Sequence, residues 1–425
     1  MRGADADTVV VGAGPHGLAA CAYLLSDRPG PADGLLVVDP QGWMTAWNRR
    51  LRSLDVGRLR SSCVHHPDPE PCALLTFAHE QAREAEMTGP FNLPSAPLFD
   101  GFCARLVERL GLGDAVVPRR ATRVRSGGGG AAVELEDGSW LRARRVVLAT
   151  NPAVPRVPDW SRELVATARP GRIAHSDDVS VDGDPLAGER VLVVGGGLTA
   201  AQLALAAVAR SARTILLSRR PLREQDFDVR PGWFTYRLER FDAQPLVERR
   251  IAILRTERRG SVPAAELAEL RAAEAHGCLE LRCGSTPNRV RWSGAHGEAL
   301  LDGEVVEVDR VWLATGHTFH VAAEPLLEEL CQTHPARIVG GLPVLTGDCR
   351  WPGTAVHLMG GLAGLQIGPL ARNVAGARIA AERIAASAGR RAPLQYPAPR
   401  ITATEIPPFP GAPPRTRPAV ALLPR

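Results

Sequence analysis

The chain has 425 residues, 45% of them hydrophobic, which is enough for two or three compact domains with buried cores. Its 51 Lys and Arg residues stand against 46 Asp and Glu residues, a mixed surface with a net charge of +5. No aromatic-rich basic stripe points to a nucleic-acid partner, and no stretch approaches the ~20 uninterrupted apolar residues of a membrane helix.

A strand, a glycine-rich turn and a helix are predicted near the N-terminus. The apolar run 9–11 leads into a Gly-x-Gly-x-x-Gly turn, and apolar residues continue through Leu24. In such a turn the first glycine permits a tight bend and the second lets the main chain approach a pyrophosphate. The third lets helix and strand pack closely. The predicted nucleotide contacts here are Gly12, Gly14, Pro15 and Gly17.

An acidic residue ends the second predicted strand of this unit. Asp39 follows Leu35–Val38 directly, at the distance from the turn where a carboxylate can bind ribose hydroxyls. A carboxylate there disfavours a ribose 2′-phosphate. The first site is therefore predicted to bind FAD or NAD rather than NADP, with Asp39 among its contacts.

Residues 41–95 form a long excursion that is rich in Arg, Pro, Trp and His and fits no strong helical or strand period. Such an excursion inside a fold is usually functional. A helix is predicted from about Leu98 to Leu110. A small antiparallel meander follows, punctuated by Gly127–Gly130 and Asp137-Gly138, and it ends in Val146–Thr150.

A second glycine turn follows the apolar run 191–194. Gly195 and Gly197 repeat the pattern, Ala200 takes the third place, and Thr199 opens the next helix. The following strand, Thr214–Leu217, ends in Ser218-Arg219-Arg220 instead of an acid. A hydroxyl and guanidinium groups suit a ribose 2′-phosphate, which favours NADPH over NADH. The alternative is that the arginines only solvate a strand end. The predicted contacts are Gly195, Gly197, Thr199, Ser218, Arg219 and Arg220.

The second unit also has a meander, with a hairpin at Asp302-Gly303, and it ends in Val311–Gly316. The nested order predicts an α/β protein with two Rossmann-like dinucleotide-binding domains, the second inserted into the first, each with its own meander. We expect residues 1–160 and 316–390 to form the first domain and residues 161–315 the second. The Pro-rich residues 391–425 are predicted to be an extended or disordered tail.

The start on a strand predicts that no signal peptide precedes the fold, and hence a cytoplasmic protein. Eight scattered cysteines fit reduced structural thiols. Cys278 and Cys283 have the Cys-x4-Cys spacing of flavin disulfide reductases, but they follow the second glycine turn, where no flavin is expected to face them. No spacing of Cys with His predicts zinc or any other metal.

With both turns in place, the chain resembles the class B flavin monooxygenases over about 390 residues. Gly12-Ala13-Gly14-Pro15 resembles the family's FAD turn and Gly195–Ala200 its NADPH turn. Ala314-Thr315-Gly316 is similar to the strand-end motif that links the domains, and Ala149-Thr150-Asn151 is a first copy with Asn in place of Gly. Gly171-x3-His175-Ser176 is similar to the family fingerprint, although Arg169 and Val179 replace its aromatic residues.

Among these enzymes the chain is nearest the ornithine and lysine N-hydroxylases in the placement of its excursion. The resemblance implies FAD and NADPH as cofactors, with Thr315 and Gly316 among the cofactor contacts. It also implies that Gly368-Pro369-Leu370 open a helix whose N–H groups face the N1–C2=O edge of the flavin.

The resemblance implies that NADPH reduces FAD and that O2 then forms a C4a-hydroperoxide, which oxidises a small nucleophile, with an amine favoured. Trp47 is the expected apolar wall and Asn48 the expected donor, although Trp47 could be ordinary core. His65, with neighbouring His66, could orient the substrate or take a proton, since imidazole titrates near neutral pH, or could be structural.

Three functional classes stay open at this point. The first is this monooxygenase, which takes a small-molecule substrate and O2. The second is an NADPH-dependent reductase or oxidase that passes electrons to a quinone, a protein or O2 without oxygen insertion. The third is a flavoprotein kept for binding or regulation. The sequence leaves the substrate, and whether a homo-oligomer forms, undecided.

Overall fold

The computed structural model describes residues 5–26, 34–162, 164, 171–182, 186–287, 289–293 and 296–390. The predicted Pro-rich tail, residues 391–425, lies outside the described residues. Within the described part of the chain, no helix is both long enough and apolar enough to span a membrane.

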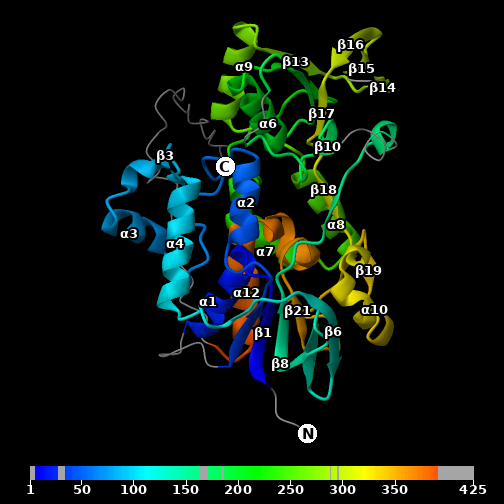
Figure 1. Cartoon of the computed structure of the whole chain (residues 1–425). Coiled ribbons are helices and arrows are strands. Elements are labelled where there is room, and N and C mark those ends of the chain that lie inside the picture. The colour runs from blue at the N-terminus through cyan, green and yellow to red at the C-terminus, as the bar shows by residue number, and fades with distance from the viewer. Residues whose placement is uncertain are drawn as a thin grey trace, which may run out of the picture. The chain divides into compact units, whose positions relative to one another are not determined.

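The first sheet has seven strands in the order β5-β2-β1-β8-β7-β6, with β21 also paired to β8. The parallel strands β1, β8 and β21 run side by side (Figure 1). The bounds are β1 Ala6–Val11, β2 Leu35–Val38, β5 Val116–Val117, β6 Ala121–Gly127, β7 Gly130–Leu135, β8 Trp140–Leu148 and β21 Val356–Leu358. Valines in β1 and at the C-terminal end of β8 are fully buried, as a parallel sheet covered on both faces requires.

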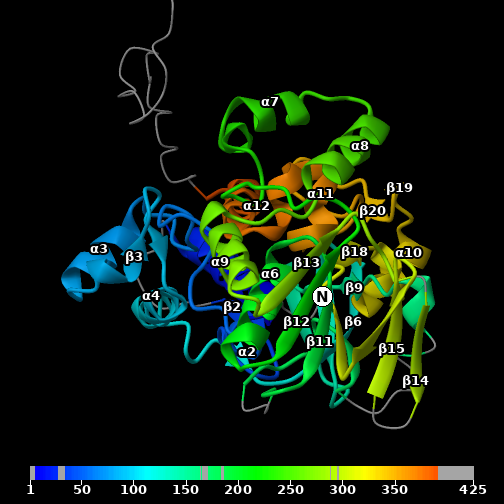
Figure 2. The same ribbon diagram turned by 90° about the horizontal axis from the view of Figure 1, so that it is seen from above.

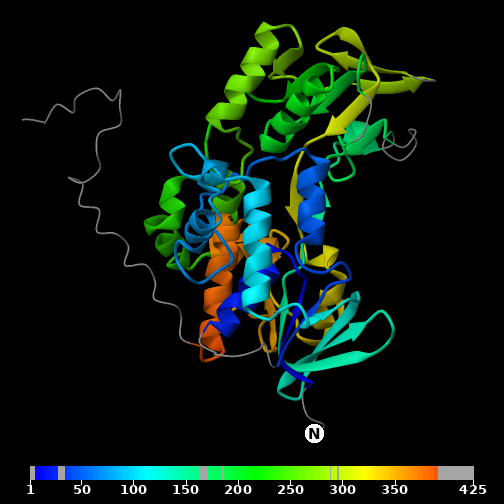
Figure 3. The ribbon, with the colours of Figure 1, turned by 60° about the vertical axis from the view of Figure 1, so that its left-hand side comes forward.

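Two helices pack against each other beside this sheet. They are α1, Pro15–Leu25, and α12, Val374–Ser387, which appear dark blue and orange in Figure 3. Strands β6 and β7 pair antiparallel with each other, and β7 pairs antiparallel with β8. These pairings confirm the first predicted meander.

The second sheet has five parallel strands in the order β10-β17-β11-β12-β13. Helices α6 and α9 lie beside it (Figure 2). The predicted second meander is the antiparallel sheet β14-β15-β16. The bounds are β10 Ile173–His175, β11 Arg190–Val194, β12 Arg213–Ser218, β13 Leu279–Cys283, β14 Arg289–Ser293, β15 His296–Leu301, β16 Glu304–Val308, β17 Arg310–Leu313, α6 Leu198–Ala209 and α9 Ala264–Ala275.

All strands of the second sheet come between β8 and β21 of the first sheet in the sequence. The two linkers that join the sheets pair with each other as β9, Ala153–Pro155, and β18, His317–Phe319. Two Rossmann-like sheets, the second nested in the first, confirm the predicted fold class. The domain boundaries at residues 160/161 and 315/316 stay a prediction.

The excursion at residues 41–95 contains short regular elements that its sequence did not reveal. Its helix α2, Thr45–Ser53, buries none of its residues completely, although Trp47 and Leu51 pack against the first core. The other elements of this stretch are α3 Ala73–Glu80, the 3-10 helix η1 Glu84–Glu86, β3 Met87–Thr88 and β4 Leu93–Pro94. Helix α4, Ala96–Arg109, follows, with the Ser95 hydroxyl capping the N–H of Leu98 at 3.0 Å.

The remaining elements connect the strands of the two sheets. Between β9 and β10 lies η2 Asp159–Ser161, and between β12 and β13 lie η3 Pro231–Phe234, α7 Tyr236–Asp242 and α8 Val247–Glu257. Between β18 and β21 lie η4 Val321–Ala323, η5 Pro325–Leu327, α10 Glu328–Thr333, β19 Ile338–Val339 and β20 Leu342–Pro343. Between β21 and α12 lie η6 Gly360–Ala363, α11 Gly364–Ile367 and η7 Gly368–Arg372.

The last helix begins later than expected. The sequence predicts a helix from Gly368-Pro369-Leu370 onward, but these residues form the 3-10 helix η7, and α12 begins at Val374. Gly368 has a φ of +75°, which interrupts a regular helix at this point.

Candidate functional site

The first glycine turn leaves open space in front of its middle glycine. A Cβ at Gly12, whose φ is +108°, would lie 2.8 Å from the carbonyl oxygen of Ala149, and one at Gly17 would lie 1.9 Å from that of Gly12. A Cβ at Gly14 would meet nothing within 4 Å. Because Gly14 precedes α1, whose first N–H groups lack partners within the helix, this space is suited to an anionic pyrophosphate.

Asp39, which is predicted to contact a ribose, also forms hydrogen bonds with the main chain of this turn and of the residues that follow it. Its Oδ2 accepts the N–H of Ala13 at 3.0 Å, and its Oδ1 accepts the N–H groups of Gln41 at 2.8 Å and Gly42 at 3.1 Å. A carboxylate has about four acceptor positions, so one remains for a ribose hydroxyl. The Asp39 contact with a nucleotide stays a prediction.

The second glycine turn repeats the first against its own Ala-Thr strand end. A Cβ at Gly195 would lie 2.3 Å from the carbonyl oxygen of Ala314, as one at Gly12 would meet Ala149. The middle position differs, because a Cβ at Gly197 would lie 3.5 Å from the Cα of Gly260. The main chain at Gly260 therefore covers the second turn, whereas the first is open at Gly14.

Ser218 ends β12, and Arg219 and Arg220 follow it; the serine is buried, whereas the two arginines are exposed. Ser218 is buried, and its hydroxyl donates to the carbonyl of Arg220 at 2.7 Å, so it supports the bend of the chain. Arg219 and Arg220 are exposed, and no described residue forms a hydrogen bond or ion pair with the guanidinium group of either. Both guanidinium groups are thus free for a phosphate, while the Ser218 hydroxyl is already occupied.

The other predicted contacts of the second unit lie near the linkers or at a helix start. Thr199 is the second residue of α6 and is half-buried. The Thr315 hydroxyl donates to the carbonyl of Arg156, and the Gly316 carbonyl accepts the N–H of Arg156 at 2.9 Å. Thr315 and Gly316 therefore hold the two linkers together, and a cofactor contact by any of the three stays a prediction.

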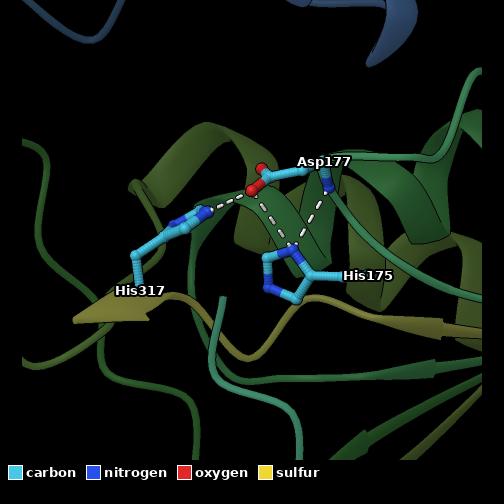
Figure 4. A group of neighbouring side chains, drawn as sticks. All are labelled: His175, Asp177 and His317. Atoms are coloured by element: carbon cyan, nitrogen blue, oxygen red, sulfur yellow. Dashed lines mark hydrogen bonds and ion pairs between the residues drawn. The ribbon is translucent and has the colours of Figure 1, made fainter. Parts of the chain in front are cut away.

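His175, Asp177 and His317 form a cluster beside the linkers (Figure 4). His317 donates from Nε2 to Asp177 at 2.6 Å, and His175 accepts the N–H of Asp177 at Nδ1 and donates from Nε2 to the carbonyl of Gly316. Burial alone would raise the pKa of Asp177, but these histidines and Arg50 of α2 hold it well below its usual range. Because both ring nitrogens of His175 are engaged, we interpret the cluster as a brace rather than a metal site.

The two predicted flavin-side residues lie on α2. The amide of Asn48 donates from Nδ2 to Asp100 of α4 at 2.5 Å, so this residue joins the two helices. Trp47 packs against the first core, and its indole N–H is buried without a hydrogen-bond partner among the described residues. A buried orphan donor is costly unless a ligand accepts from it, so a contact of Trp47 with a cofactor stays a prediction.

His65 lines a small cavity, and its pKa lies below the near-neutral value expected of a free imidazole. Its ring stacks on Phe234 with 4.5 Å between centroids. Burial, with the charge of Arg378 adding to it, lowers the pKa of His65 from 6.5 to about 4. This shift opposes a charge change of the His65 imidazole near neutral pH, and its role at the site stays a prediction. The cavity is lined by Arg60, Ser61, His65, Phe227, Asp228, Phe234, Asn373 and Ala375.

The neighbouring His66 predicts acid sensitivity of the fold. It is fully buried against Phe102, and burial, with the charges of Arg378 and His65, lowers its pKa from 6.5 to about 3. Between these two values the unfolded chain binds a proton that the folded chain does not. Stability from His66 is therefore complete above pH 6.5 and falls as the pH drops toward 3.

The parent protein should lose free energy of unfolding when the pH falls from 6.5 to 5. We expect His66→Leu to lose less over the same range, with a difference of up to about 2 kcal/mol. Urea unfolding at each pH measures this difference. His79→Leu is the control, because the side chain of His79 is 84% exposed. Parallel pH profiles for His66→Leu and the parent would contradict the prediction.

The residues expected at the flavin edge are packed into protein. Gly368, Pro369 and Leu370 are buried, and a Cβ at Gly368 would lie 3.4 Å from Phe241 and 3.5 Å from Trp233. The helix that follows begins after Asn373, so its free N–H groups belong to residues five or more positions later than predicted. A flavin contact by Gly368, Pro369 or Leu370 stays a prediction.

Sequence reasoning missed Arg60, which ties the excursion to the second unit. Its guanidinium donates to Asp228 Oδ1 at 3.0 Å, to the Ser261 hydroxyl at 2.9 Å, and to several carbonyls. These carbonyls are those of Gln225, Asp226, Phe227 and Ser261. No sequence signal marks such a residue, because its partners lie at least 165 positions away.

We expect Arg60→Met to destabilise the protein by about 2 kcal/mol or more, because it leaves these acceptors and Asp228 without their donor. Arg58→Met is the matched control. The side chain of Arg58 is 37% exposed, and among the described residues it makes one hydrogen bond to Thr88 and a 3.8 Å ion pair to Glu266, so its loss should cost less than about 1 kcal/mol. Urea denaturation of both variants measures the difference, and equal losses would refute the bracing role of Arg60.

Comparison with known proteins extends the fold assignment. Residues 9–152 match a family model described as FAD-NAD(P)-binding, so the first glycine turn lies in an FAD/NAD(P)-binding domain. No curated protein matches the chain.

Solved structures with the same fold include two ornithine hydroxylases and a cadaverine monooxygenase. An ornithine hydroxylase from Pseudomonas aeruginosa is 19% identical with a TM-score of 0.71, and an ornithine N-hydroxylase from Kutzneria sp. 744 is 17% identical with a TM-score of 0.73. Each match covers 90% of this chain and 98% of the other. A cadaverine monooxygenase from Erwinia amylovora is 16% identical with a TM-score of 0.72, and that match covers 97% and 99%. The chain thus has the fold of two-dinucleotide-binding flavoproteins.

Proposed function

We propose that this protein is an FAD- and NADPH-dependent monooxygenase that hydroxylates the nitrogen of a small amine. NADPH, a proton, O2 and the amine would give NADP⁺, water and the hydroxylamine. The main support is the pair of glycine turns, each backed by an Ala-Thr strand end, in a fold shared with two ornithine hydroxylases and a cadaverine monooxygenase.

The residues present fit an FAD molecule at the first turn. The open space at Gly14 suits its pyrophosphate, the spare acceptor position of Asp39 suits its ribose, and the orphan indole N–H of Trp47 offers a donor. Bound FAD supplies the chemistry that takes a hydride from NADPH and activates O2.

The protein's own tasks are to bind, orient and exclude water. Arg219 and Arg220 offer two free guanidinium groups to the 2′-phosphate of NADPH. His65 stays neutral at physiological pH and can therefore accept a hydrogen bond from a protonated amine without adding charge. Trp233 and Phe241, both buried, keep water from the turn that precedes α12.

The test is product formation by the purified protein loaded with FAD. NADPH oxidation, peroxide release and hydroxylamine mass are measured with ornithine, lysine and cadaverine, with ¹⁸O2 as the source of oxygen. One ¹⁸O atom in the product supports the proposal. NADPH consumption that yields only peroxide with every amine would instead favour the reductase or oxidase. Cys278 and Cys283, which have the spacing of a disulfide reductase, are exposed beside and at the end of β13 in the second sheet, far in the chain from the first glycine turn.

A further inference from the structure

The second glycine turn is closed at the position where the first is open. A Cβ at Gly197 would lie 3.5 Å from the Cα of Gly260, whereas one at Gly14 would meet nothing within 4 Å. A Cβ at Gly196 would lie 2.4 Å from the Ser218 hydroxyl, so the turn is also covered there. A pyrophosphate has to reach the first N–H groups of the helix that follows such a turn. In the second unit the main chain at Gly260 lies in the way.

Two main chains can meet at this point because neither carries a side chain. A Cβ on Gly260 would lie 3.2 Å from both the carbonyl oxygen of Gly196 and the Cα of Gly197, and 3.3 Å from the nitrogen of Gly197. Carbon atoms in favourable contact are about 3.5–4.0 Å apart. A side chain at position 260 would therefore push the two segments away from each other.

The segment that covers the turn is the short connection between α8 and α9, and its residues 259–262 are termed the gate. The gate lies against the residues that follow β12. The N–H of Val262 donates to the carbonyl of Arg223 at 2.9 Å, and the carbonyl of Val262 accepts the N–H of Gln225 at 3.0 Å. The gate is thus a defined piece of main chain with its own support.

A single guanidinium from the excursion holds the gate in place. Arg60 donates to the hydroxyl of Ser261 at 2.9 Å and to its carbonyl at 3.2 Å, and it also holds Asp228 at 3.0 Å. The side chain of Arg60 is only 11% exposed, so these hydrogen bonds are shielded from water and correspondingly strong. Arg60 also lines the cavity that contains His65, so one residue connects this cavity with the gate.

The chain on both sides of the gate is held independently of Arg60. Arg258, which precedes the gate, donates to the carbonyl of Pro369 at 2.9 Å. The N–H of Ala264, which begins α9, donates to Asp226 at 3.3 Å. Loss of Arg60 can therefore free the gate while the two helices that flank it keep their anchors.

We propose that the gate closes the second turn to the pyrophosphate of NADPH and that Arg60 is the latch that holds it shut, so that NADPH binds only when the gate lifts. This inference rests on the proposed function, because it assigns the control of NADPH entry at that site. A ligand that binds only the open form has its affinity reduced by the fraction of molecules that are open. Changes that open the gate therefore tighten NADP⁺ binding, whereas the loss of a merely structural contact does not.

The experiment measures the dissociation constant of NADP⁺ by calorimetry with the FAD-loaded protein. Arg60→Met removes the latch, and Gly260→Val places a side chain between the gate and the turn. We expect each variant to lower the dissociation constant at least about fivefold. The double variant should bind NADP⁺ no more tightly than the better of the two, because both changes open the same gate. If Arg60→Met fails to fold, Gly260→Val decides alone.

Two matched variants control for the lost charge and for the added side chain. Arg58→Met removes a neighbouring arginine of the excursion, whose ion-pair partner in the second unit is Glu266 of α9, outside the gate. Gly57→Val adds the same side chain at a glycine of the excursion where a Cβ would meet nothing within 4 Å. Both should leave the dissociation constant of NADP⁺ unchanged. An equal gain of affinity in the controls would overturn the latch.

The gate covers a part of the cofactor that NADP⁺ and NAD⁺ share. Arg60→Met and Gly260→Val should therefore tighten the binding of NAD⁺ by the same factor and leave the preference between the two nucleotides as it is in the parent. A changed preference would assign the effect to Arg219 and Arg220, which are expected to contact the 2′-phosphate, and would overturn the gate.

Two further results would also overturn the gate. The affinity for NADP⁺ could fall or stay the same in both variants, which would leave Arg60 as a structural brace. The parent and every variant could fail to bind NADP⁺, which would remove NADPH from the proposed function as well. Tighter NADP⁺ binding without any hydroxylated product would support the gate and refute the proposed hydroxylation, so the two failures are distinguishable.

Discussion

Replacing Gly14 by valine is expected to abolish FAD binding while the protein stays folded. In the free protein a Cβ at this position meets nothing within 4 Å, so the substitution causes no clash. The same space is where the main chain must approach the pyrophosphate, and a side chain there would keep the phosphates from the first N–H groups of α1. We expect an FAD dissociation constant at least about 100-fold higher, equivalent to about 2.7 kcal/mol. Flavin absorbance after desalting and a melting curve measure the two effects.

Two further variants sharpen this prediction. Gly57→Val is the matched control, since a Cβ at Gly57 also meets nothing within 4 Å and lies on the excursion, so FAD content should stay normal. Gly17→Ala should damage the fold itself, because its Cβ would lie 1.9 Å from a carbonyl oxygen. Full FAD occupancy in Gly14→Val would refute the assignment of this turn.

Replacing Arg219 by alanine is expected to remove most of the preference for NADPH over NADH. Arg219 is exposed at the end of β12 without a side-chain partner among the described residues, so its loss should leave the fold unchanged. A charged hydrogen bond to a phosphate contributes about 1.5–3 kcal/mol, so KM for NADPH should rise about 10- to 100-fold while KM for NADH stays the same.

The control for this prediction is on the same strand. Arg213 is exposed at the other end of β12, and Arg213→Ala removes the same charge without reaching the turn. It should leave both KM values as they are. Initial rates of NADPH and NADH oxidation give both constants, and an unmoved preference in Arg219→Ala would refute the assignment of NADPH to this strand end.

The sequence predicted the parts of the fold in which the local geometry allows only one type of residue. Gly12 and Gly195 must be glycine because each meets the carbonyl of an alanine at the end of a neighbouring strand. Because of this requirement, both the glycine turns and the repeated Ala-Thr strand ends could be recognised in the sequence. Their order along the chain then predicted the insertion that the strand pairing confirms.

The parts that the sequence did not predict depend on contacts between distant segments. Helix α2 has one face, with Trp47 and Leu51, that packs against the first core, but its nine residues stand among irregular segments and were not recognised as a helix. The hydroxyl of Ser218 turns inward to Arg220, a detail of the main-chain path that its residue type cannot reveal. Even the low pKa of His65 arises from burial that folding creates.

The pairing of the two linkers has a consequence for the modularity of the chain. Ala153 of β9 lies opposite Phe319 of β18, and every strand of the second sheet comes between these two residues in the sequence. A short loop that joins β9 directly to β18 would therefore excise the second sheet and reconnect β8 to β21 with the strand order of the first sheet unchanged. The inserted unit is a cassette with adjacent ends, the geometry that lets one domain be acquired, exchanged or deleted at a single place in another.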